Sequence, residues 1–345
     1  MISLFLFKID NDNITISYSP SSLLIHPDEL IVVSEIDNLQ GLSIMGKPFF
    51  SYKLINKHNM ETKLRIALQK KGRLNEDSMK LMKEAGIKFN VGSGKLVASS
   101  PNFPIEVLFL RDDDIPQTVA DDVADIGIVG ENEMAEKGFE LKIAKRLGFS
   151  KCRLSLAIPK AEDYTGLQFF EGKKVATSYP VILEKYFKEQ KVNAEIHEIA
   201  GSVEIAPGIG LAEGIFDIVS SGSTLVANRL KEVEVVMKSE ALLVAGANLS
   251  PEKQALLDEM LFRIESVMAA NSNKYILMNV PNDKIDEIVK ILPGMKSPTV
   301  LPLAESGWSS VHSVIKEKKF WEIIGQLKAL GAEGLLVVPI EKMIL

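Results

Sequence analysis

The chain has 345 residues, of which 46% are hydrophobic and 25% charged, and this composition suits two or three globular domains. Its formal net charge of −6 provides no general basic field, so we expect no nucleic-acid partner. No apolar run approaches the roughly 20 residues that cross a bilayer, so no membrane association is expected. The single cysteine, Cys152, excludes an intrachain disulfide, which fits a cytoplasmic location.

Residues 1–59 differ in pattern from the rest of the chain. Residues 2–7 are apolar but too few for a signal-peptide core, and no positive charge precedes them. Short strands are possible at residues 30–33 and 49–54, without a sustained period. Met60 then precedes a clean apolar strand. We interpret residues 1–59 as an extension outside the working protein, although a small added domain fits equally well.

From Met60 onward, strand and helix patterns alternate, which is typical of an α/β fold. In the first block we predict strands at 64–68, 105–110 and 125–129, and helices at 75–85, 116–123 and 133–137. In the second block we predict strands at 153–158, 174–177 and 194–199, and helices at 181–190 and 208–214. Strands at 233–236 and 241–245 should return the chain toward the first block, and a long helix should span 252–270.

The last segment has a pattern of its own. We predict strands at 275–280, 299–303, 309–315 and 334–340, and helices at 283–292 and 320–330. The resulting order β-α-β-β-α-β is that of a ferredoxin-like domain. Such a domain could sense a small ligand or serve only for oligomerisation.

The most informative stretch is DIVSSGSTL, residues 217–225. An apolar strand ends in Asp217, a hydroxyl-rich turn follows, and residues 225–230 suit a helix. Free backbone N–H groups and hydroxyls in such a turn can bind a phosphate, and Gly222 permits φ > 0. The alternative is a Ser/Gly turn that only caps a helix.

Other charged residues give weaker signals. Lys70, Lys71 and Arg73 form a turn that either is simply solvated or holds phosphate oxygens at the carboxyl end of a strand. The acidic run 112–114 is most simply helix N-terminal charge. Asp125 and Glu131 flank a buried strand, and Glu131, at its carboxyl end, is the better site candidate. The sequence contains no Walker or Rossmann phosphate motif and no metal-ligand spacing among its four histidines.

The stretch 217–225 resembles the phosphoribosyl-pyrophosphate (PRPP) loop of the ATP phosphoribosyltransferase family, the first enzyme of histidine biosynthesis. Five further stretches match that family in order, at residues 69–74, 111–116, 125–132, 176–180 and 201–207. The tail is similar to the regulatory domain of the family's long form at residues 274–276, 297–299 and 327–332. Two departures stand out: residues 1–59 match nothing in the family, and Gly208 replaces a frequent arginine.

The resemblance implies a fold and an activity. The fold would be a two-lobed catalytic core like a type II periplasmic binding protein, followed by a ferredoxin-like regulatory domain. Residues 60–149 with 240–272 would form the first lobe, residues 150–239 the second lobe, and residues 273–345 the regulatory domain. The enzyme would transfer phosphoribose from PRPP to N1 of ATP and be inhibited by histidine.

The resemblance also implies site residues. PRPP would be held by Asp217, Ser220, Ser221, Gly222, Ser223 and Thr224. ATP or pyrophosphate would contact Gln69, Lys70, Arg73, Arg111, Glu131 and Tyr179. Mg²⁺ would arrive mainly on PRPP, and no protein ligand is assigned to it. Histidine would bind at Asn279, Thr299, Val314 and Gly334, in a pocket shared between subunits of a homo-oligomer that forms dimers and hexamers.

Two alternatives belong to other functional classes. A solute-binding protein has the same two-lobed shape, but the missing signal peptide and the attached tail argue against it. A catalytically degenerate regulatory protein is the other, and the intact loop at 217–225 argues against that.

Overall fold

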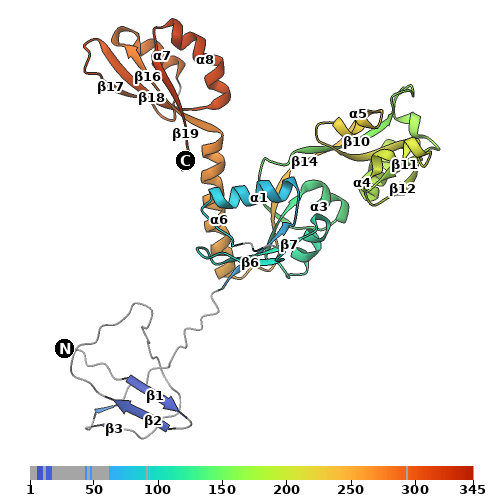
Figure 1. Ribbon diagram of the computed structural model, residues 1–345, viewed down its shortest axis with the longest axis horizontal. Coiled ribbons are helices and arrows are strands. Elements are labelled where there is room, and N and C mark those ends of the chain that lie inside the picture. Colours follow the sequence, from blue (N-terminus) through green and yellow to red (C-terminus); the bar gives the residue numbers. More distant parts are fainter. Residues whose placement is uncertain are drawn as a thin grey trace. The chain divides into compact units, whose positions relative to one another are not determined.

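The computed structural model describes residues 62–344 except 91, 93 and 293, together with four short strands before them. The chain divides into two units, Met1–Glu61 and Thr62–Leu345 (Figure 1). In the first unit, β1 (Leu6–Asp10) pairs antiparallel with β2 (Asn13–Ser17), and β3 (Ser43–Ile44) pairs with β4 (Lys47–Pro48). None of these strands was predicted, and the strands considered at 30–33 and 49–54 lie outside the described residues.

The second unit begins with a six-stranded sheet in the order β6-β7-β5-β8-β15-β9. Its strands are β5 (Leu64–Gln69), β6 (Val97–Ser99), β7 (Ile105–Leu110), β8 (Ile126–Gly130), β9 (Lys142–Arg146) and β15 (Ala241–Ala245). Strands β7, β5 and β8 are parallel, and β15 is antiparallel to both of its neighbours. All five residues of β15 are buried, as expected for a central strand covered on both faces.

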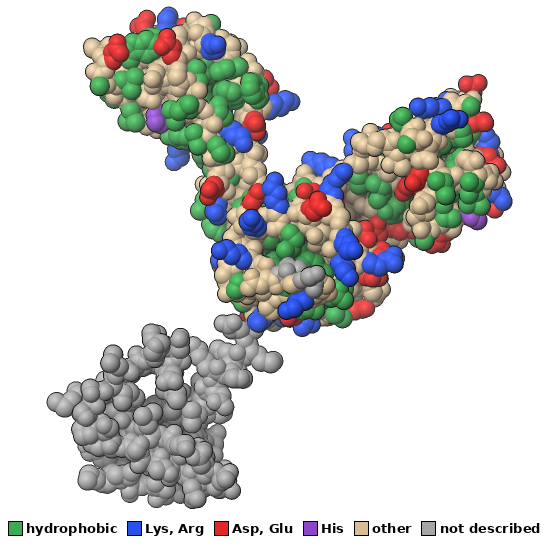
Figure 2. Space-filling model, in the orientation of Figure 1, with side chains coloured by type: hydrophobic (Ala, Val, Ile, Leu, Met, Phe, Trp, Pro, Cys, Tyr) green, Lys and Arg blue, Asp and Glu red, His purple; other side chains and the backbone are tan. Residues whose placement is uncertain are grey.

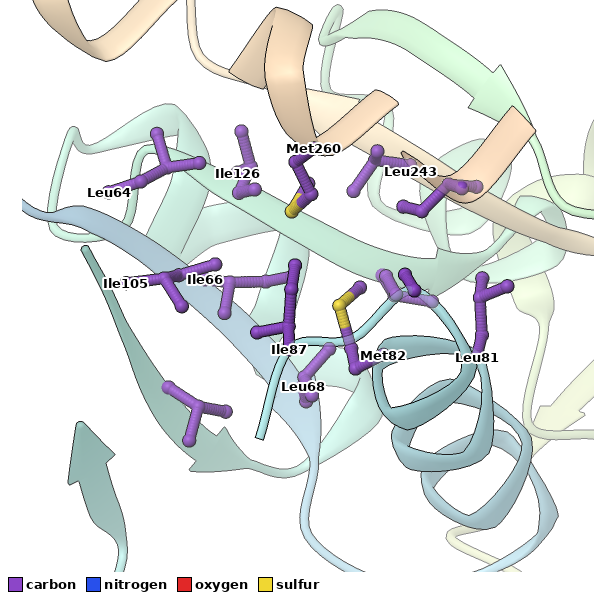
Figure 3. Close-up of a cluster of buried hydrophobic side chains, with 14 of the residues drawn as sticks. Leu64, Ile66, Leu68, Leu81, Met82, Ile87, Ile105, Ile126, Leu243 and Met260 are labelled. Atoms are coloured by element: carbon purple, nitrogen blue, oxygen red, sulfur yellow. The ribbon is translucent and has the colours of Figure 1, made fainter. Parts of the chain in front are cut away.

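The larger of the two buried clusters of this first lobe lies on one face of the sheet (Figure 3). Leu64, Ile66 and Leu68 of β5 point to this face because strand side chains alternate. Two helices cover them, α1 (Arg73–Glu84) with Met82 and α6 (Pro251–Asn271) with Met260, each fully buried. Helices α2 (Ile115–Ala120) and α3 (Glu131–Lys137) complete the lobe.

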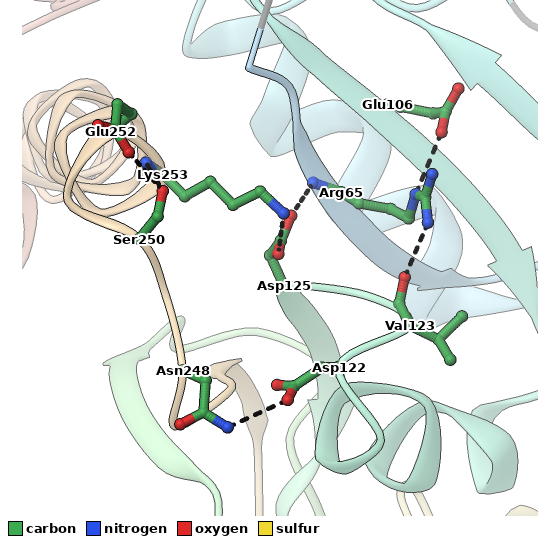
Figure 4. Close-up of polar contacts among 9 residues, drawn as sticks. All are labelled: Arg65, Glu106, Asp122, Val123, Asp125, Asn248, Ser250, Glu252 and Lys253. Atoms are coloured by element: carbon green, nitrogen blue, oxygen red, sulfur yellow. Dashed lines mark hydrogen bonds and ion pairs between the residues drawn. The ribbon is translucent and has the colours of Figure 1, made fainter.

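Asp125 has a structural position at the amino end of β8 (Figure 4). Its carboxylate accepts a hydrogen bond from the backbone N–H of Arg65 and pairs with Lys253 Nζ, each at 2.7 Å. Lys253 lies in the first turn of α6, where Ser250 caps the helix by accepting from the Lys253 N–H at 3.3 Å. Asp125 therefore fastens α6 to the sheet, and Glu131 at the other end of β8 stays the better site candidate.

The second lobe is a five-stranded sheet in the order β12-β11-β13-β10-β14. Its strands are β10 (Cys152–Pro159), β11 (Lys174–Thr177), β12 (Glu195–Glu198), β13 (Gly214–Val219) and β14 (Leu230–Ser239), with helices α4 (Pro180–Gln190) and α5 (Ser223–Ala227). In both lobes, three adjacent parallel strands are followed in the sheet by one antiparallel strand, which is β15 in the first lobe and β10 in the second. Each of these two strands begins where the chain has crossed over from the other lobe. This shared order is the type II periplasmic-binding-protein topology, so the predicted fold class is confirmed.

The C-terminal part forms a four-stranded antiparallel sheet in the order β17-β18-β16-β19. Its strands are β16 (Asn273–Pro281), β17 (Thr299–Pro302), β18 (Trp308–Lys316) and β19 (Glu333–Pro339). Helices α7 (Ile285–Ile291) and α8 (Glu317–Ala329) pack on one face, over Ile276, Met278 and Val311 (Figure 1). The predicted ferredoxin-like order is confirmed.

Two predicted helices differ from the structure. Residues 208–214 do not form a helix: a single 3₁₀ turn, Pro207–Ile209, ends at Gly210, whose φ of 75° leaves the helical region. The helix expected at 225–230 begins and ends earlier, as α5, because Arg229 has a φ of 56° and β14 starts at Leu230. Strands β6 and β9 were not predicted.

Candidate active site

The loop 220–224 comprises the turn that follows β13 and the first two residues of α5 in the second lobe. Gly222 has φ 81° and ψ 1°, so the prediction of a left-handed glycine is confirmed. Its carbonyl accepts from the Val226 N–H at 3.1 Å and so starts the helix. The Oγ atoms of Ser221 and Ser223 are 3.0 Å apart, which gathers hydroxyl groups at the turn.

Asp217 precedes this loop on β13 and is half-buried. Its Oδ1 accepts a hydrogen bond from the N–H of Ile218 at 2.7 Å. Burial, aided by the charge of Glu204, raises the pKa of Asp217 to about 6 against the lowering effect of that hydrogen bond. Across the sheet Asp217 pairs with Ser155, whose hydroxyl donates to Glu232 at 2.7 Å.

Two arginines contact Ser220 from different elements. Arg73, the first residue of α1 in the first lobe, donates from Nη1 to Ser220 Oγ at 2.9 Å. Arg153 of β10 donates from Nη1 to the Ser220 carbonyl at 3.1 Å and is itself paired with Glu232. The structure thus brings the basic turn of the first lobe against the hydroxyl loop of the second.

The other candidates in the first lobe lie at the carboxyl ends of its strands. The Gln69 carbonyl accepts from Asn75 Nδ2 at 2.5 Å, and the exposed Lys70 donates its N–H to the Leu110 carbonyl at 2.7 Å. Arg111 is exposed and pairs with Asp113 through Nε at 3.0 Å. Among these candidates, Arg73 is thus the one with a recorded hydrogen bond to the loop of the second lobe.

Glu131 and Tyr179 are held by protein partners. Glu131 accepts two hydrogen bonds from Arg146, at 2.8 and 2.5 Å. The buried Tyr179 hydroxyl donates to Glu133 at 2.9 Å and lies 3.3 Å from Asn132 Nδ2. Burial raises the pKa values of Tyr179 and Glu133 above their usual ranges, and the two groups share one hydrogen-bond network.

This network belongs to a contact between α3 of the first lobe and α4 of the second. The Glu136 carboxylate accepts from the N–H groups of Val181 and Ile182, at 2.9 and 3.0 Å, in the first turn of α4. A carboxylate placed there satisfies two backbone donors that have no partner within the helix. We call this set, with Glu133 and Tyr179, the α3–α4 contact. Sequence reasoning missed it because its acids appeared only as part of a short helix.

The four candidate effector residues lie in the C-terminal sheet. Asn279 of β16 and Gly334 of β19 are neighbours, since a Cβ on Gly334 would lie 3.4 Å from Asn279 Nδ2. Thr299 of β17 pairs with His312, and Val314 lies two residues further along β18. By strand alternation, Asn279, Thr299 and Val314 share the face opposite α7 and α8.

A hydrogen-bonded group on the same face was not predicted. The Tyr275 hydroxyl lies 2.7 Å from His312 Nδ1, and Ser310 Oγ lies 2.9 Å from His312 Nε2. Alternation along β18 would have placed Ser310 and His312 beside Val314, so this signal was present in the sequence.

Two negative findings apply to the described residues. They contain no group of three or more His, Cys, Asp or Glu side chains arranged to hold a metal ion. In the same part of the chain, no helix is both long enough and apolar enough to span a membrane.

Comparison with known proteins agrees with this geometry. The family model described as ATP phosphoribosyltransferase matches residues 111–266, and the model of its C-terminal domain matches residues 270–342. The ATP phosphoribosyltransferase of Bacteroides thetaiotaomicron is 66% identical over 281 residues, covering 81% of this chain and 99% of that protein. The one from Phocaeicola vulgatus is 66% identical over 282 residues, covering 82% and 100%.

A solved structure gives the same result for the core. The ATP phosphoribosyl transferase (HisG:HisZ) complex from Thermotoga maritima superposes with a TM-score of 0.54 at 27% identity, covering 61% of this chain and 99% of that one. Fold and site together define a two-lobed transferase with a C-terminal ferredoxin-like domain. The chain belongs to the ATP phosphoribosyltransferase family, which acts in histidine biosynthesis.

Proposed function

We propose that the protein transfers the phosphoribosyl group of PRPP to N1 of ATP, which yields phosphoribosyl-ATP and pyrophosphate. The observation that carries this proposal is the hydrogen bond from Arg73 to Ser220, which joins the basic turn of one lobe to the hydroxyl loop of the other. Two polyanionic substrates need countercharge and hydroxyl donors at one place, and this contact supplies both. The reaction would be the first step of histidine biosynthesis.

The second lobe would hold PRPP. The backbone N–H groups and hydroxyls of Ser220, Ser221, Ser223 and Thr224 bind the 5′-phosphate, and Gly222 lets the backbone approach it closely. Asp217 in its ionised form accepts hydrogen bonds from the ribose hydroxyls. Because most of the work is positioning, the half-buried site and its fixed donors supply the main rate effect.

The chemistry is a displacement at the ribose C1. The bond from C1 to the diphosphate oxygen breaks, its electron pair leaves with the diphosphate, and the lone pair of adenine N1 forms the new bond. Positive charge develops on the ribose and negative charge on the leaving group. Mg²⁺ enters as part of the PRPP substrate, and Lys70, Arg73 and Arg111 add countercharge from the first lobe.

Gln69, Glu131 and Tyr179 complete the proposed surroundings of ATP or pyrophosphate. Glu131 would act while held by Arg146. Tyr179 would reach a ligand only after its hydroxyl leaves Glu133, so ligand binding would compete with the α3–α4 contact. ATP and PRPP would therefore bind next to α3 and α4, which are already in contact with each other.

The C-terminal domain would bind histidine at Asn279, Thr299, Val314 and Gly334. Three of these share one sheet face and the fourth adjoins Asn279, which supports a common pocket. A pocket shared between subunits would require a homo-oligomer, which we propose to form dimers and hexamers. We further propose that the enzyme is cytoplasmic. Inhibition would then be allosteric, with a coupling free energy between two distinct sites.

The test is pyrophosphate release from purified protein in the presence of ATP, PRPP and Mg²⁺. We expect release that requires both substrates, and inhibition by histidine that disappears when residues 273–345 are removed. Folded protein that releases no pyrophosphate would contradict the proposal. Binding of PRPP without turnover would instead indicate a two-lobed binding protein or a catalytically degenerate regulatory protein.

A further inference from the structure

A pocket lies where the chain crosses between the two lobes, at the start of β10 and at the junction of β14 with β15. Its volume is about 610 Å³, within the usual range for small-molecule sites, roughly 300–1,000 Å³. Its charged lining residues are Glu131, Arg146, Lys151, Arg153, Lys238 and Glu240. We call it the hinge pocket.

The hinge pocket carries surplus positive charge. Both carboxylates of the lining, Glu131 and Glu240, pair with Arg146, whereas the lining contains three further cations, Lys151, Arg153 and Lys238. Within the described residues, the exposed Lys151 and Lys238 have no ion-pair partner within 4.0 Å. On the visible face of the two lobes, basic and acidic side chains are interspersed (Figure 2).

Two of the cations are directly opposed across the sheet. Arg153 of β10 pairs in register with Lys238 of β14, so their side chains leave the sheet on the same face. Like charges at such a position are unfavourable by themselves. Glu232 balances Arg153, but among the described residues Lys238 has no comparable partner. An anion bound in the pocket would remove this repulsion.

The pocket adjoins the proposed PRPP loop. Ser220 is one of its lining residues, and its carbonyl accepts from Arg153 at 3.1 Å. On its other side, Ser220 Oγ accepts from Arg73 at 2.9 Å. A ligand whose 5′-phosphate occupies the loop would therefore lie next to the cations of the hinge pocket, on the side of Ser220 that contacts Arg153.

We propose that the hinge pocket binds a polyphosphate group, with Lys151, Arg153 and Lys238 as its cations. The identity of this polyphosphate group rests on the proposed function, which offers two candidates, the diphosphate of PRPP and the triphosphate of ATP. In either case, the pocket stabilises phosphate charge at the crossing between lobes. Polyphosphate binding would thereby be coupled to the relative position of the two crossing segments.

The test uses the full chain and three variants. Lys238→Gln and Lys151→Gln each remove one exposed cation from the pocket. Lys231→Gln is the matched control, because Lys231 lies on the same strand, β14, but does not line the pocket. Binding of inorganic pyrophosphate and of tripolyphosphate is measured by calorimetry, and KM values for PRPP and ATP are measured in parallel.

We expect each pocket variant, but not the control, to bind pyrophosphate roughly tenfold more weakly, the loss of one charge-assisted contact. A rise in KM for PRPP alone identifies its diphosphate as the occupant. A loss confined to tripolyphosphate and ATP identifies the triphosphate instead. Unchanged binding of both probes in the two folded pocket variants would overturn the proposal. If the wild-type chain binds pyrophosphate through Lys238 but has no transferase activity, the proposed function fails and the anion site stands.

Discussion

Gly222 determines the conformation of the proposed PRPP loop, because its φ of 81° suits glycine and strains other residues. We expect Gly222→Val to weaken PRPP binding by roughly five- to 150-fold, since a β-branched residue in this region costs about 1–3 kcal/mol. Gly208→Ala is the control, because nothing lies within 4 Å of its Cβ position and its φ is not in the positive range. Equal PRPP affinities in the two variants, measured by calorimetry, would place the phosphate elsewhere.

Asp217 should make PRPP binding depend on pH. Its pKa is raised to about 6, so the carboxylate that would accept hydrogen bonds from the ribose is the dominant form only above that pH. We expect KM for PRPP to rise as the pH falls below 6, approaching tenfold per pH unit, and Asp217→Asn to flatten this dependence. A KM profile that is identical in both proteins would remove Asp217 from the site.

The same raised pKa has a consequence of opposite sign for stability. The folded state holds its proton on Asp217 more tightly than the unfolded state does, so this contribution to stability is lost as the pH rises through 6. Asp217→Asn removes the cost of the buried charge. Its thermal midpoint should therefore exceed that of the wild-type protein at pH values above 6, and the gain should shrink below that value.

At the scale of elements, the α3–α4 contact makes a separate prediction. Tyr179→Phe removes the hydroxyl that donates to the buried Glu133 at 2.9 Å and leaves Asn132 Nδ2 as the remaining donor to that oxygen, and the loss of one such hydrogen bond costs about 0.5–1.5 kcal/mol. We expect a lower free energy of unfolding in urea. Tyr186→Phe serves as the control, because Tyr186 lies on α4, the helix that Tyr179 precedes, and its hydroxyl makes no hydrogen bond within the described part of the chain. Equal losses in both variants would mean that the contact contributes nothing.

The strands and helices differ in how well the sequence alone predicts them. Central strands such as β5 and β8 were predicted because continuous apolar runs between turns identify buried strands. Strand β9, with the sequence KIAKR at the sheet edge, was missed because it lacks such a run. The loop at Gly222 was predicted from local chemistry. Contacts such as Glu136 with the first turn of α4 join residues 45 apart, and no local pattern announces them.

For the whole molecule, the division into Met1–Glu61 and Thr62–Leu345 makes the extension a testable part. The Bacteroides thetaiotaomicron relative aligns over 99% of its own length but over only 81% of this chain. The part of this chain that has no counterpart in that relative is therefore about as long as the extension. We expect a chain that begins at Met60 to keep the thermal midpoint and the kcat of the full chain. Loss of either property, measured on the purified protein, would show that residues 1–59 belong to the working enzyme.

The position of β15 has a consequence for the order in which the protein is made. This fully buried strand lies between β8 and β9, yet more than ninety residues separate it in sequence from the end of β9, as Ala241 and Arg146 mark. The ribosome therefore releases the complete second lobe before the first lobe can close its sheet. During that interval β8 presents an open edge, a known route to mispairing between chains. We expect nascent chains arrested before residue 241 to contain a folded second lobe and a protease-sensitive first lobe, as limited proteolysis would reveal.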